Sequence, residues 1–243
     1  MIRLILTGLL LLVFFILSIP ILLVEWLIGK RFPKARDISS LRIVQFVLRI
    51  ILWLSGSHVN VIGKDNIPKD QAVLYIVNHR SIFDVVLTYP NCPGLTGYIA
   101  KIELMKIPFL SHWMKRLYCL FLDRQDIKAG LKTILTAIDY VKSGISIVIF
   151  PEGTRGKDSN ECNMLPFHEG SFKIATKTGC PIIPVTLNHT SEIFEDHFPW
   201  IRKTEVTIEY GTPIDPKALT LEQKKFIGKY VQSVMQEMLQ KNH

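Results

Sequence analysis

Residues 72–84 read AVLYIVNHRSIFD and join a run of β-forming apolar residues to a polar segment. The run Ala72–Val77 has the composition of a buried strand, because Val, Ile, Leu and Tyr dominate it. Ser81 and Asp84 then match the pattern of residues that starts a helix. The stretch therefore predicts a strand, a short polar loop and a helix, which is the unit of a wound α/β sheet.

The same unit recurs from His58 onward. Apolar residues return at helical spacing over Ile127–Lys142, with Asp126 as the expected N-cap, and again over Leu221–Leu239. We expect strands at His58–Ile62, Ala72–Val77, Thr96–Ala100, Leu117–Leu122, Ser146–Phe150, Ile182–Leu187 and Glu205–Tyr210. The sequence thus predicts an α/β fold with a mixed, mostly wound sheet of about seven strands flanked by helices.

The first 56 residues have a different character. Leu4–Val24 is uncharged and apolar, and as a helix it would extend roughly 30 Å, the thickness of the hydrocarbon core of a bilayer. Leu41–Ser55 is amphipathic, since Arg42, Gln45 and Arg49 interrupt it near one helical face. We expect a membrane-associated two-helix segment, whose second helix either lies in the interface or returns as the arm of a shallow hairpin.

The predicted domain boundary follows this segment. Residues 1–56 form the expected membrane anchor and residues 57–243 the expected α/β domain. A group of cations stands between the two apolar runs and favours the cytoplasmic side for that region, at Lys30, Arg31, Lys34 and Arg36. We therefore expect the chain at the cell membrane, with the α/β domain on the cytoplasmic face.

Composition narrows the classes of partner. Hydrophobic residues make up 48% of the chain, the net charge is +8, and the mean hydropathy is +0.25. Lys and Arg are spread along the chain without interleaved aromatics, which argues against a nucleic-acid partner. A basic surface beside an apolar N-terminus instead favours a bilayer, and it also suits anionic substrates.

The four cysteines show no paired or metal-ligand spacing. They are Cys92, Cys119, Cys162 and Cys180. Cys119 and Cys180 fall in or beside apolar runs, so we expect buried free thiols there. We expect neither a metal nor a cofactor.

His79 and Asp84 are the first candidate pair for chemistry. Histidine exchanges protons near neutral pH, and a carboxylate on its second ring nitrogen fixes its tautomer and orientation. In one continuous helix, five residues would separate the two side chains by about 140°. They meet if His79 lies on the loop and a helix begins near Ser81. The structural alternative is a helix cap made by Ser81 and Asp84, with no catalytic role.

A second motif, FPEGTR at residues 150–155, follows another predicted strand. Gly153 allows a tight turn and close approach of the backbone to a ligand. The hydroxyl of Thr154 and the guanidinium of Arg155 can hold a phosphate. The alternative is an ordinary turn in which Arg155 pairs with a carboxylate such as Glu152.

With both motifs in view, the sequence resembles the glycerophospholipid acyltransferase family, in particular the bacterial-type 1-acyl-sn-glycerol-3-phosphate acyltransferases. Four blocks stand in the order of that family, namely NHRSIFD at 78–84, FLDR at 121–124, FPEGTR at 150–155 and IIPV at 182–185. Flanking matches are Ala100, Lys101, Glu103, Leu104 and Pro108. The resemblance extends over residues 58–210, and four ordered blocks are far more specific than one.

The resemblance implies a catalytic domain with His79 as general base and Asp84 as the carboxylate that orients it. The base would act on the sn-2 hydroxyl of lysophosphatidic acid as that oxygen attacks an acyl thioester, carried by acyl-carrier protein or coenzyme A, to give phosphatidic acid for phospholipid biosynthesis. The residues implied in acceptor binding are Glu152, Gly153, Thr154 and Arg155. Lys101 and Arg124 are further candidates, and each could equally be an ordinary surface ion-pair residue.

The sequence departs from the family pattern at three positions. Ser111 and Tyr118 stand where glycines are expected, so the local backbone near the second block is expected to differ. In the segment 167–170, His168 and Glu169 precede a glycine that usually follows Lys or Arg. We interpret His168 as a surface substitution.

Three other functions remain open from sequence. The acceptor could be glycerol-3-phosphate or a different lysophospholipid, because the blocks are shared across the family. The chain could be a non-catalytic membrane lipid-binding protein with the same fold, although both principal blocks are intact. A metal-dependent hydrolase using His79 and Asp84 is disfavoured, since no further ligands cluster nearby.

Overall fold

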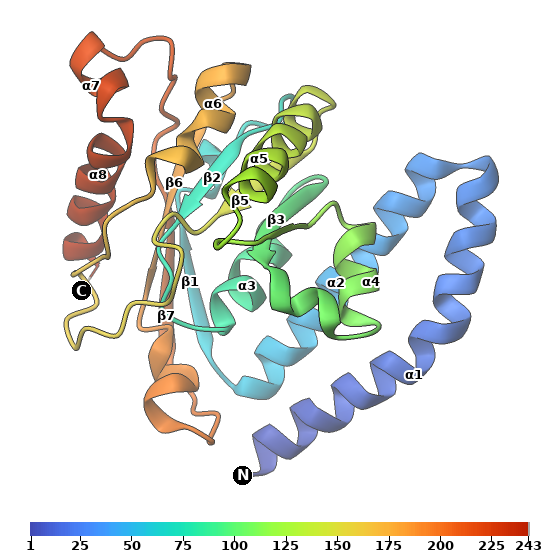
Figure 1. Cartoon of the computed structure of the whole chain (residues 1–243). Helices are drawn as coiled ribbons and strands as arrows, with labels where there is room; N and C mark the ends of the chain where they lie inside the picture. Colours follow the sequence, from blue (N-terminus) through green and yellow to red (C-terminus); the bar gives the residue numbers. More distant parts are fainter. Residues whose placement is uncertain (243) are drawn as a thin grey trace.

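The computed structural model describes residues 1–242, which contain one seven-stranded sheet with helices on both faces (Figure 1). The strand order is β1-β7-β6-β2-β5-β3-β4, and every neighbouring pair is parallel except β6 with β7. The bounds are β1 His58–Ile62, β2 Leu74–Val77, β3 Thr96–Lys101, β4 Leu120–Leu122, β5 Ser146–Ile149, β6 Ile182–Asn188 and β7 Glu205–Tyr210. The predicted mixed, mostly wound sheet is confirmed, with shorter strands at β2, β4 and β5.

Eight α-helices and six short 3-10 helices connect or cover the strands of the described chain. The α-helices are α1 Ile2–Arg31, α2 Pro33–Ser55, α3 Phe83–Thr88, α4 Leu110–Arg116, α5 Ile127–Lys142, α6 Lys173–Thr178, α7 Leu221–Lys225 and α8 Ile227–Lys241. The 3-10 helices are η1 Lys64–Asn66, η2 Tyr89–Asn91, η3 Ile102–Lys106, η4 Glu169–Phe172, η5 Ser191–Ile193 and η6 Glu195–His197. The predicted helix Ile127–Lys142 is confirmed, and the Asp126 carboxylate caps it by accepting from the backbone N–H groups of Lys128 and Ala129.

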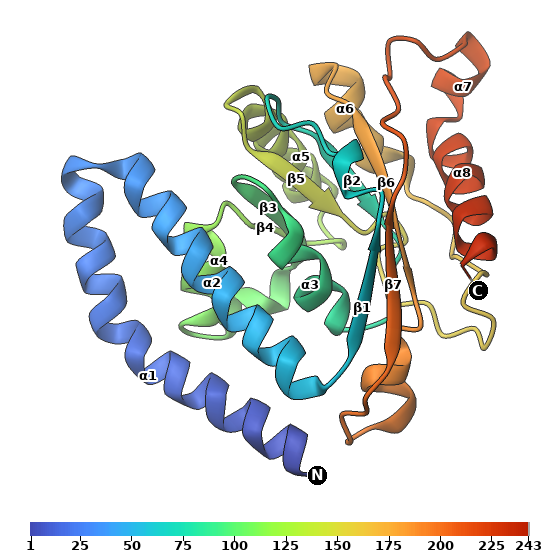
Figure 2. The same cartoon turned by 180° about the vertical axis from the view of Figure 1, so that it is seen from behind.

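Strand β2 shows how one short sequence divides the core between two layers. Side chains alternate along a strand, so Leu74 and Ile76 point to one face of the sheet, while Tyr75 and Val77 point to the other. The first pair belongs to the core under α5, α6 and α8, and the second to the core under α2 and α3. All four residues are buried, because helices cover both faces of this central strand (Figure 2).

The C-terminal helix predicted over Leu221–Leu239 is wrong in one respect, because the structure breaks it into α7 and α8. The break falls at Phe226, whose φ of −124° and ψ of 46° are not helical. Two local contacts stabilise separate helices. Thr220 caps α7 with a reciprocal pair of hydrogen bonds, and the Glu169 carboxylate accepts from the backbone N–H of Gly228 in the first turn of α8.

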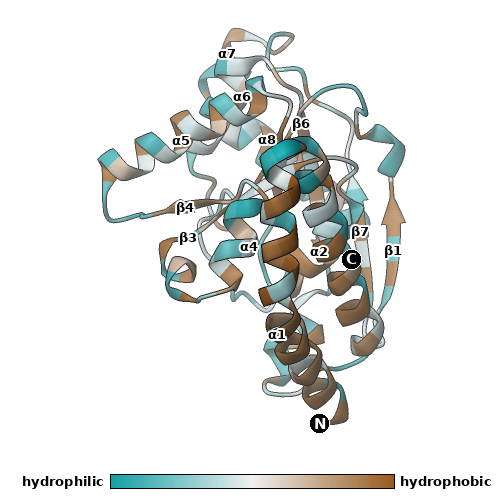
Figure 3. Cartoon of the chain, turned by 90° about the vertical axis from the view of Figure 1, so that its right-hand side faces the viewer, coloured by the Kyte–Doolittle hydropathy of each residue, from teal (hydrophilic) through white to brown (hydrophobic). Residues whose placement is uncertain are grey.

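Helices α1 and α2 form a hairpin joined at Phe32, and both are long and apolar enough to cross a membrane by length and composition. Figure 3 shows that hydrophobic residues dominate the N-terminal part of α1, whereas the turn between the helices is polar. Helix α1 is bent, and Pro20 lies within it, where the ring removes a backbone donor (Figure 1). The apolar helices make the N-terminus compatible with membrane association.

The polar side of α2 has a different environment from the one expected for an interfacial helix. Gln45 is fully buried and donates to the carbonyl oxygens of Tyr89 and Cys92, and Arg49 donates to the carbonyl oxygen of Pro90. Gln45 and Arg49 of the polar stripe therefore donate to carbonyl groups in and directly after η2, while Arg42 and Arg49 remain exposed. The placement of α2 relative to a bilayer stays a prediction.

The cysteines are buried and free, as expected for Cys119 and Cys180. Burial raises the pKa of Cys119 to about 12 and that of Cys92 to about 11, so these thiols stay protonated and unreactive at neutral pH.

Candidate active site

His79 and Asp84 meet at the carboxyl end of β2. The loop after the strand carries His79, and α3 begins at Phe83, so its first turn presents Asp84. The ring Nδ1 of His79 lies 2.7 Å from Oδ2 of Asp84. The Asp84 side chain has no exposed surface, whereas that of His79 is 21% exposed. The structure thus places the histidine on the loop and the carboxylate on the helix, as the spacing required.

Asp84 also holds the loop that carries His79. Its Oδ2 accepts hydrogen bonds from the backbone N–H groups of Arg80 at 2.8 Å and Ser81 at 2.9 Å. The Oγ of Ser81 in turn accepts from the N–H of Phe83, one residue earlier in the helix than an ideal capping box would use. The capping and orienting roles therefore coexist in one carboxylate.

The imidazole ring of His79 has an aromatic neighbour on its face in addition to the carboxylate at its edge. It stacks on Phe150, with centroids 4.2 Å apart and an interplanar angle of 25°. Because Nδ1 faces Asp84, Nε2 lies on the opposite edge of the imidazole, on a partly exposed side chain. A histidine held in this way can accept a proton at Nε2 while the carboxylate stabilises the cation that forms.

The second motif follows β5, which pairs directly with β2. Gly153 closes a turn by donating to the carbonyl oxygen of Phe150, and its φ of +73° requires the freedom of glycine. The N–H of Gly156 then donates to the carbonyl oxygen of His79 at 2.8 Å. The loops after two adjacent parallel strands are therefore joined through their backbones.

Glu152 lies between these loops. It is buried, and its two oxygens accept from the N–H groups of His79 and Leu165, each at 2.8 Å. Burial raises the pKa of Glu152, against the lowering effect of these two donors. The buried carboxylate thus stabilises the backbone of the His79 loop. Direct contact between Glu152 and an acceptor substrate stays a prediction.

Arg155 and Thr154 are exposed beside the histidine loop. The Nη1 of Arg155 lies 2.7 Å from Oε1 of Glu195, and half of the arginine side chain is open to solvent. The expectation that this arginine could pair with a carboxylate is met by Glu195 and not by Glu152. A guanidinium with a solvent-exposed ion pair can exchange that partner for a phosphate.

The remaining predicted residues lie at different distances from this turn. A Cβ on Gly153 would lie 3.0 Å from Nε2 of His168 and 3.8 Å from Cζ of Arg124, so both side chains border the turn. From sequence alone, we interpret His168 as a surface substitution. Its side chain is exposed, as expected, but it also lies beside the Gly153 turn, which that interpretation did not predict. Lys101 ends β3 and forms an exposed pair with Glu103 at 3.0 Å.

Sequence reasoning missed two residues of the site. The side-chain amide of Asn78 exchanges two hydrogen bonds with the backbone of Leu187, which extends the β2–β6 pairing beyond the end of β2. Glu195 accepts from the Oγ of Ser81 at 2.5 Å and from the N–H of Ile82 at 2.8 Å, in addition to Arg155. Asn78 stood in the recognised motif, whereas Glu195 lies 113 residues beyond Ile82 and no local pattern identifies it.

Tyr118 accounts for a departure from the family pattern. Its φ of +61° lies in the left-handed region where a glycine is favoured, so a tyrosine occupies a backbone position that suits the glycine expected there. The phenol donates to the carboxylate of Asp37 in α2, and burial together with this partner raises the pKa of Tyr118 to about 12. Ser111, by contrast, lies within the helix α4.

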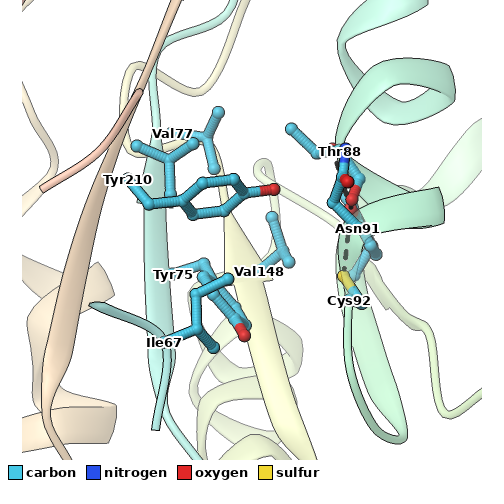
Figure 4. A pocket seen from close by; sticks show the side chains of 10 residues that line it. Ile67, Tyr75, Val77, Thr88, Asn91, Cys92, Val148 and Tyr210 are labelled. Carbon is cyan, nitrogen blue, oxygen red and sulfur yellow. Dashed lines mark hydrogen bonds between the residues drawn. The ribbon is translucent and has the colours of Figure 1, made fainter. Parts of the chain in front are cut away.

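A small cavity lies between β2 and η2 (Figure 4). Its volume is about 10 Å³, enough for roughly one water molecule. Residues that line it include Tyr75, Tyr210, Thr88, Asn91 and Cys92. The cavity is too small for an acyl chain. Within residues 1–242, no group of three or more His, Cys, Asp or Glu side chains is placed to hold a metal ion.

Comparison with known proteins identifies related sequences. The family model described as Acyltransferase matches residues 58–188. A 1-acyl-sn-glycerol-3-phosphate acyltransferase of Borreliella burgdorferi is 36% identical over 60% of this chain and 58% of its own length. The Saccharomyces cerevisiae protein of the same name is 30% identical over 88% of this chain and 67% of its own length. The chain therefore spans 58% and 67% of these two curated relatives.

A solved structure resembles nearly the whole chain. The crystal structure of the 1-acyl-sn-glycerophosphate (LPA) acyltransferase PlsC from Thermotoga maritima aligns with a TM-score of 0.84 and 26% sequence identity. The alignment covers 99% of this chain and 94% of that one, so it includes the two N-terminal helices as well as the sheet.

Proposed function

The chain belongs to the Acyltransferase family, and from that membership we propose that it acylates 1-acyl-sn-glycerol-3-phosphate, that is, lysophosphatidic acid. The donor is an acyl thioester of acyl-carrier protein or coenzyme A, and the product is phosphatidic acid for phospholipid biosynthesis. The observation that carries the proposal is the buried Asp84 carboxylate, 2.7 Å from a histidine whose other ring nitrogen is turned away from it.

The proposed reaction needs one base and no covalent enzyme intermediate. Nε2 of His79 removes the proton of the sn-2 hydroxyl while that oxygen attacks the thioester carbonyl carbon. Asp84 stabilises the imidazolium that forms. The tetrahedral intermediate then collapses, the C–S bond breaks, and His79 returns the proton to the departing thiolate. The products are the ester and a free thiol, and the histidine is regenerated.

Arg155 is the proposed principal ligand of the acceptor phosphate. It stands beside the loop that carries the base, and its present partner is a half-open ion pair with Glu195. Thr154, Arg124 and His168 border the same turn and are proposed to complete a polar cradle for the phosphate. Lys101 sits on the neighbouring strand end and is the more peripheral of the proposed contacts.

The N-terminal hairpin is the proposed membrane platform. Apolar side chains of α1 such as Ile5, Leu9 and Leu12 are more than half exposed, which in water would leave a large apolar surface unsatisfied. We propose that residues 1–56 place this surface in a bilayer, with the catalytic domain, residues 57–243, on its cytoplasmic face.

The test is an acylation assay with purified full-length chain in phospholipid vesicles. Oleoyl-coenzyme A and oleoyl-acyl-carrier protein are each offered with lysophosphatidic acid, glycerol-3-phosphate or lysophosphatidylcholine, and products are identified by mass spectrometry. We expect phosphatidic acid to exceed the other products by about tenfold or more. The cationic turn favours a phosphate monoester over the diester of lysophosphatidylcholine, and the acyl chain of lysophosphatidic acid, which glycerol-3-phosphate lacks, holds that acceptor in the vesicle. A preference for another acceptor would overturn the acceptor assignment, and no transfer from either donor would overturn the function.

A further inference from the structure

An exposed aromatic loop, residues 198–203, follows η6 on the catalytic domain. The side chain of Phe198 is 74% exposed and that of Trp200 is 41% exposed. The loop is nevertheless anchored, because Ile201 is buried and the N–H of Arg202 donates to the carbonyl oxygen of Ile193. An anchored loop that exposes two large aromatic side chains to solvent is typical of an interaction surface.

The aromatic loop lies at the same end of the molecule as the start of α1. The N–H of His58 donates to the carbonyl oxygen of Thr204, directly after the loop. Two residues before His58, the space above Gly56 is filled by Arg3, whose Nη2 would lie 2.9 Å from a Cβ there. Figures 1 and 2 both show the N-terminus and the orange segment that contains the loop at the lower end of the molecule.

The nearby charges favour a lipid surface over a protein as the partner. Arg202 and Lys203 are exposed within the loop, next to the aromatics, and Arg3 is close to the same end, whereas the exposed carboxylates Asp196 and Glu205 lie outside the loop on either side. Aromatic rings at the level of the lipid headgroups, with cations beside them, are the usual composition of a segment that contacts an anionic bilayer. Many apolar side chains of α1 are exposed as well, and hydrophobic residues dominate the N-terminal part of that helix (Figure 3).

We propose that the aromatic loop is a second bilayer contact, on the catalytic domain itself, with Phe198 and Trp200 in the interface and Arg202 and Lys203 on anionic headgroups. The inference rests on the proposed membrane attachment of α1 and adds a separate surface to it. With contacts at α1 and at the loop, the catalytic domain has a defined orientation on the membrane instead of pivoting about one helix.

The loop is also connected to the active site. Phe194 packs between Phe198, with centroids 5.4 Å apart, and Phe83, with centroids 6.5 Å apart, and Phe83 precedes Asp84 in α3. The adjacent Glu195 accepts from the Oγ of Ser81 in the His79 loop. The aromatic loop is therefore packed against the elements that hold His79 and Asp84.

The test places an environment-sensitive fluorophore at single cysteines of the full-length chain. Phe198→Cys is the probe, Ile5→Cys on α1 reports the proposed platform, and Leu221→Cys on the distant α7, where the side chain is 88% exposed, is the matched control. The four native cysteines are buried, so labelling of the folded chain is selective. Quenching is measured in vesicles of phosphatidylcholine and phosphatidylglycerol that carry doxyl-labelled lipid.

We expect quenching of at least about twofold at positions 198 and 5 and none at 221. Quenching at position 5 without quenching at 198 would overturn the loop contact and leave the membrane attachment of α1 intact. Absence of quenching at both positions would overturn the attachment on which the inference rests. As a second measurement, Arg202→Gln with Lys203→Gln should weaken the increase of 198 quenching with phosphatidylglycerol content by about fivefold, and an unchanged dependence would contradict the proposed headgroup contacts.

Discussion

The loops after β2 and β5 follow adjacent parallel strands, yet they are built differently. In the β2 loop, one buried carboxylate oxygen of Asp84 engages His79 and two backbone N–H groups. In the β5 loop, Glu152 is buried, but Arg155 beyond the turn is half exposed with a single ion-pair partner. The difference fits the proposal that the first loop holds the base in place, whereas the second keeps a charge available for exchange with a ligand. Substitutions in the first should therefore reduce kcat, and substitutions in the second should raise KM.

The largest effect is expected for His79→Ala. Removal of the proposed base should lower kcat by about 10⁴-fold, because general base catalysis is lost, while KM for lysophosphatidic acid changes little. Steady-state kinetics in vesicles measure both constants. His58→Ala, at the exposed edge strand β1, is the control and should retain full turnover. Unimpaired turnover of His79→Ala would remove the mechanism.

Asp84→Asn should lower kcat by about 10³-fold. The amide oxygen can still accept from the backbone of Arg80 and Ser81, so the loop keeps its shape while the charge beside His79 is lost. Circular dichroism and thermal unfolding should therefore show a folded protein. If Asp84→Asn unfolded at the assay temperature, the result would support a structural role for Asp84 as a helix cap and would contradict the expectation that the loop keeps its shape.

Arg155→Ala should raise KM for lysophosphatidic acid by about tenfold, with kcat changed less than about threefold, because a partly exposed phosphate contact is lost. Arg155→Lys should lie between, since lysine supplies charge without a bidentate fork. Lys142→Ala, at the exposed end of α5, controls for the change in net charge. An unchanged KM would exclude Arg155 from the acceptor site.

Glu195 contacts both loops, and two substitutions separate its roles. Glu195→Gln can keep the contacts with Ser81 and Ile82 but loses the ion pair with Arg155, so KM for the acceptor should fall by about twofold. Glu195→Ala also removes the loop contacts and should lower kcat by about fivefold. Glu192→Gln, on the neighbouring η5, is the matched control. Identical kinetics for the two Glu195 variants would contradict this division.

The smallest effect concerns stability and pH. Because the pKa of Glu152 is raised in the folded state, the folded chain binds more protons than the unfolded chain between the ordinary value of 4.5 and the raised value. The stability contributed by Glu152 is therefore fully present below pH 4.5 and falls as pH rises through the raised pKa. The Tm advantage over Glu152→Gln should shrink by about 2 °C across that window. A Tm difference that does not vary with pH would show that folding leaves the pKa of Glu152 unchanged.

Much of the fold and half of the site could be predicted from local patterns. The seven strands and the helix Ile127–Lys142 followed from residue type and periodicity, which depend on neighbours within one or two turns. The approach of His79 to Asp84 was predictable because both lie within one strand–loop–helix unit. The break at Phe226 was not, because the apolar spacing continues through it while the contact of Glu169 with α8 comes from 59 residues away.

The sequence by itself determined the order of the strands along the chain, the histidine and carboxylate at the end of β2, and the basic turn after β5. Each of these features depends on a short stretch of sequence, and the spacing of residues within that stretch is compatible with few local conformations. Only the tertiary structure decided that the polar side of α2 meets η2, that Asn78 completes a strand pair with Leu187, and that Glu195 joins both loops. These contacts join residues 40 to 114 positions apart in the sequence, and they depend on how the sheet and its helices pack.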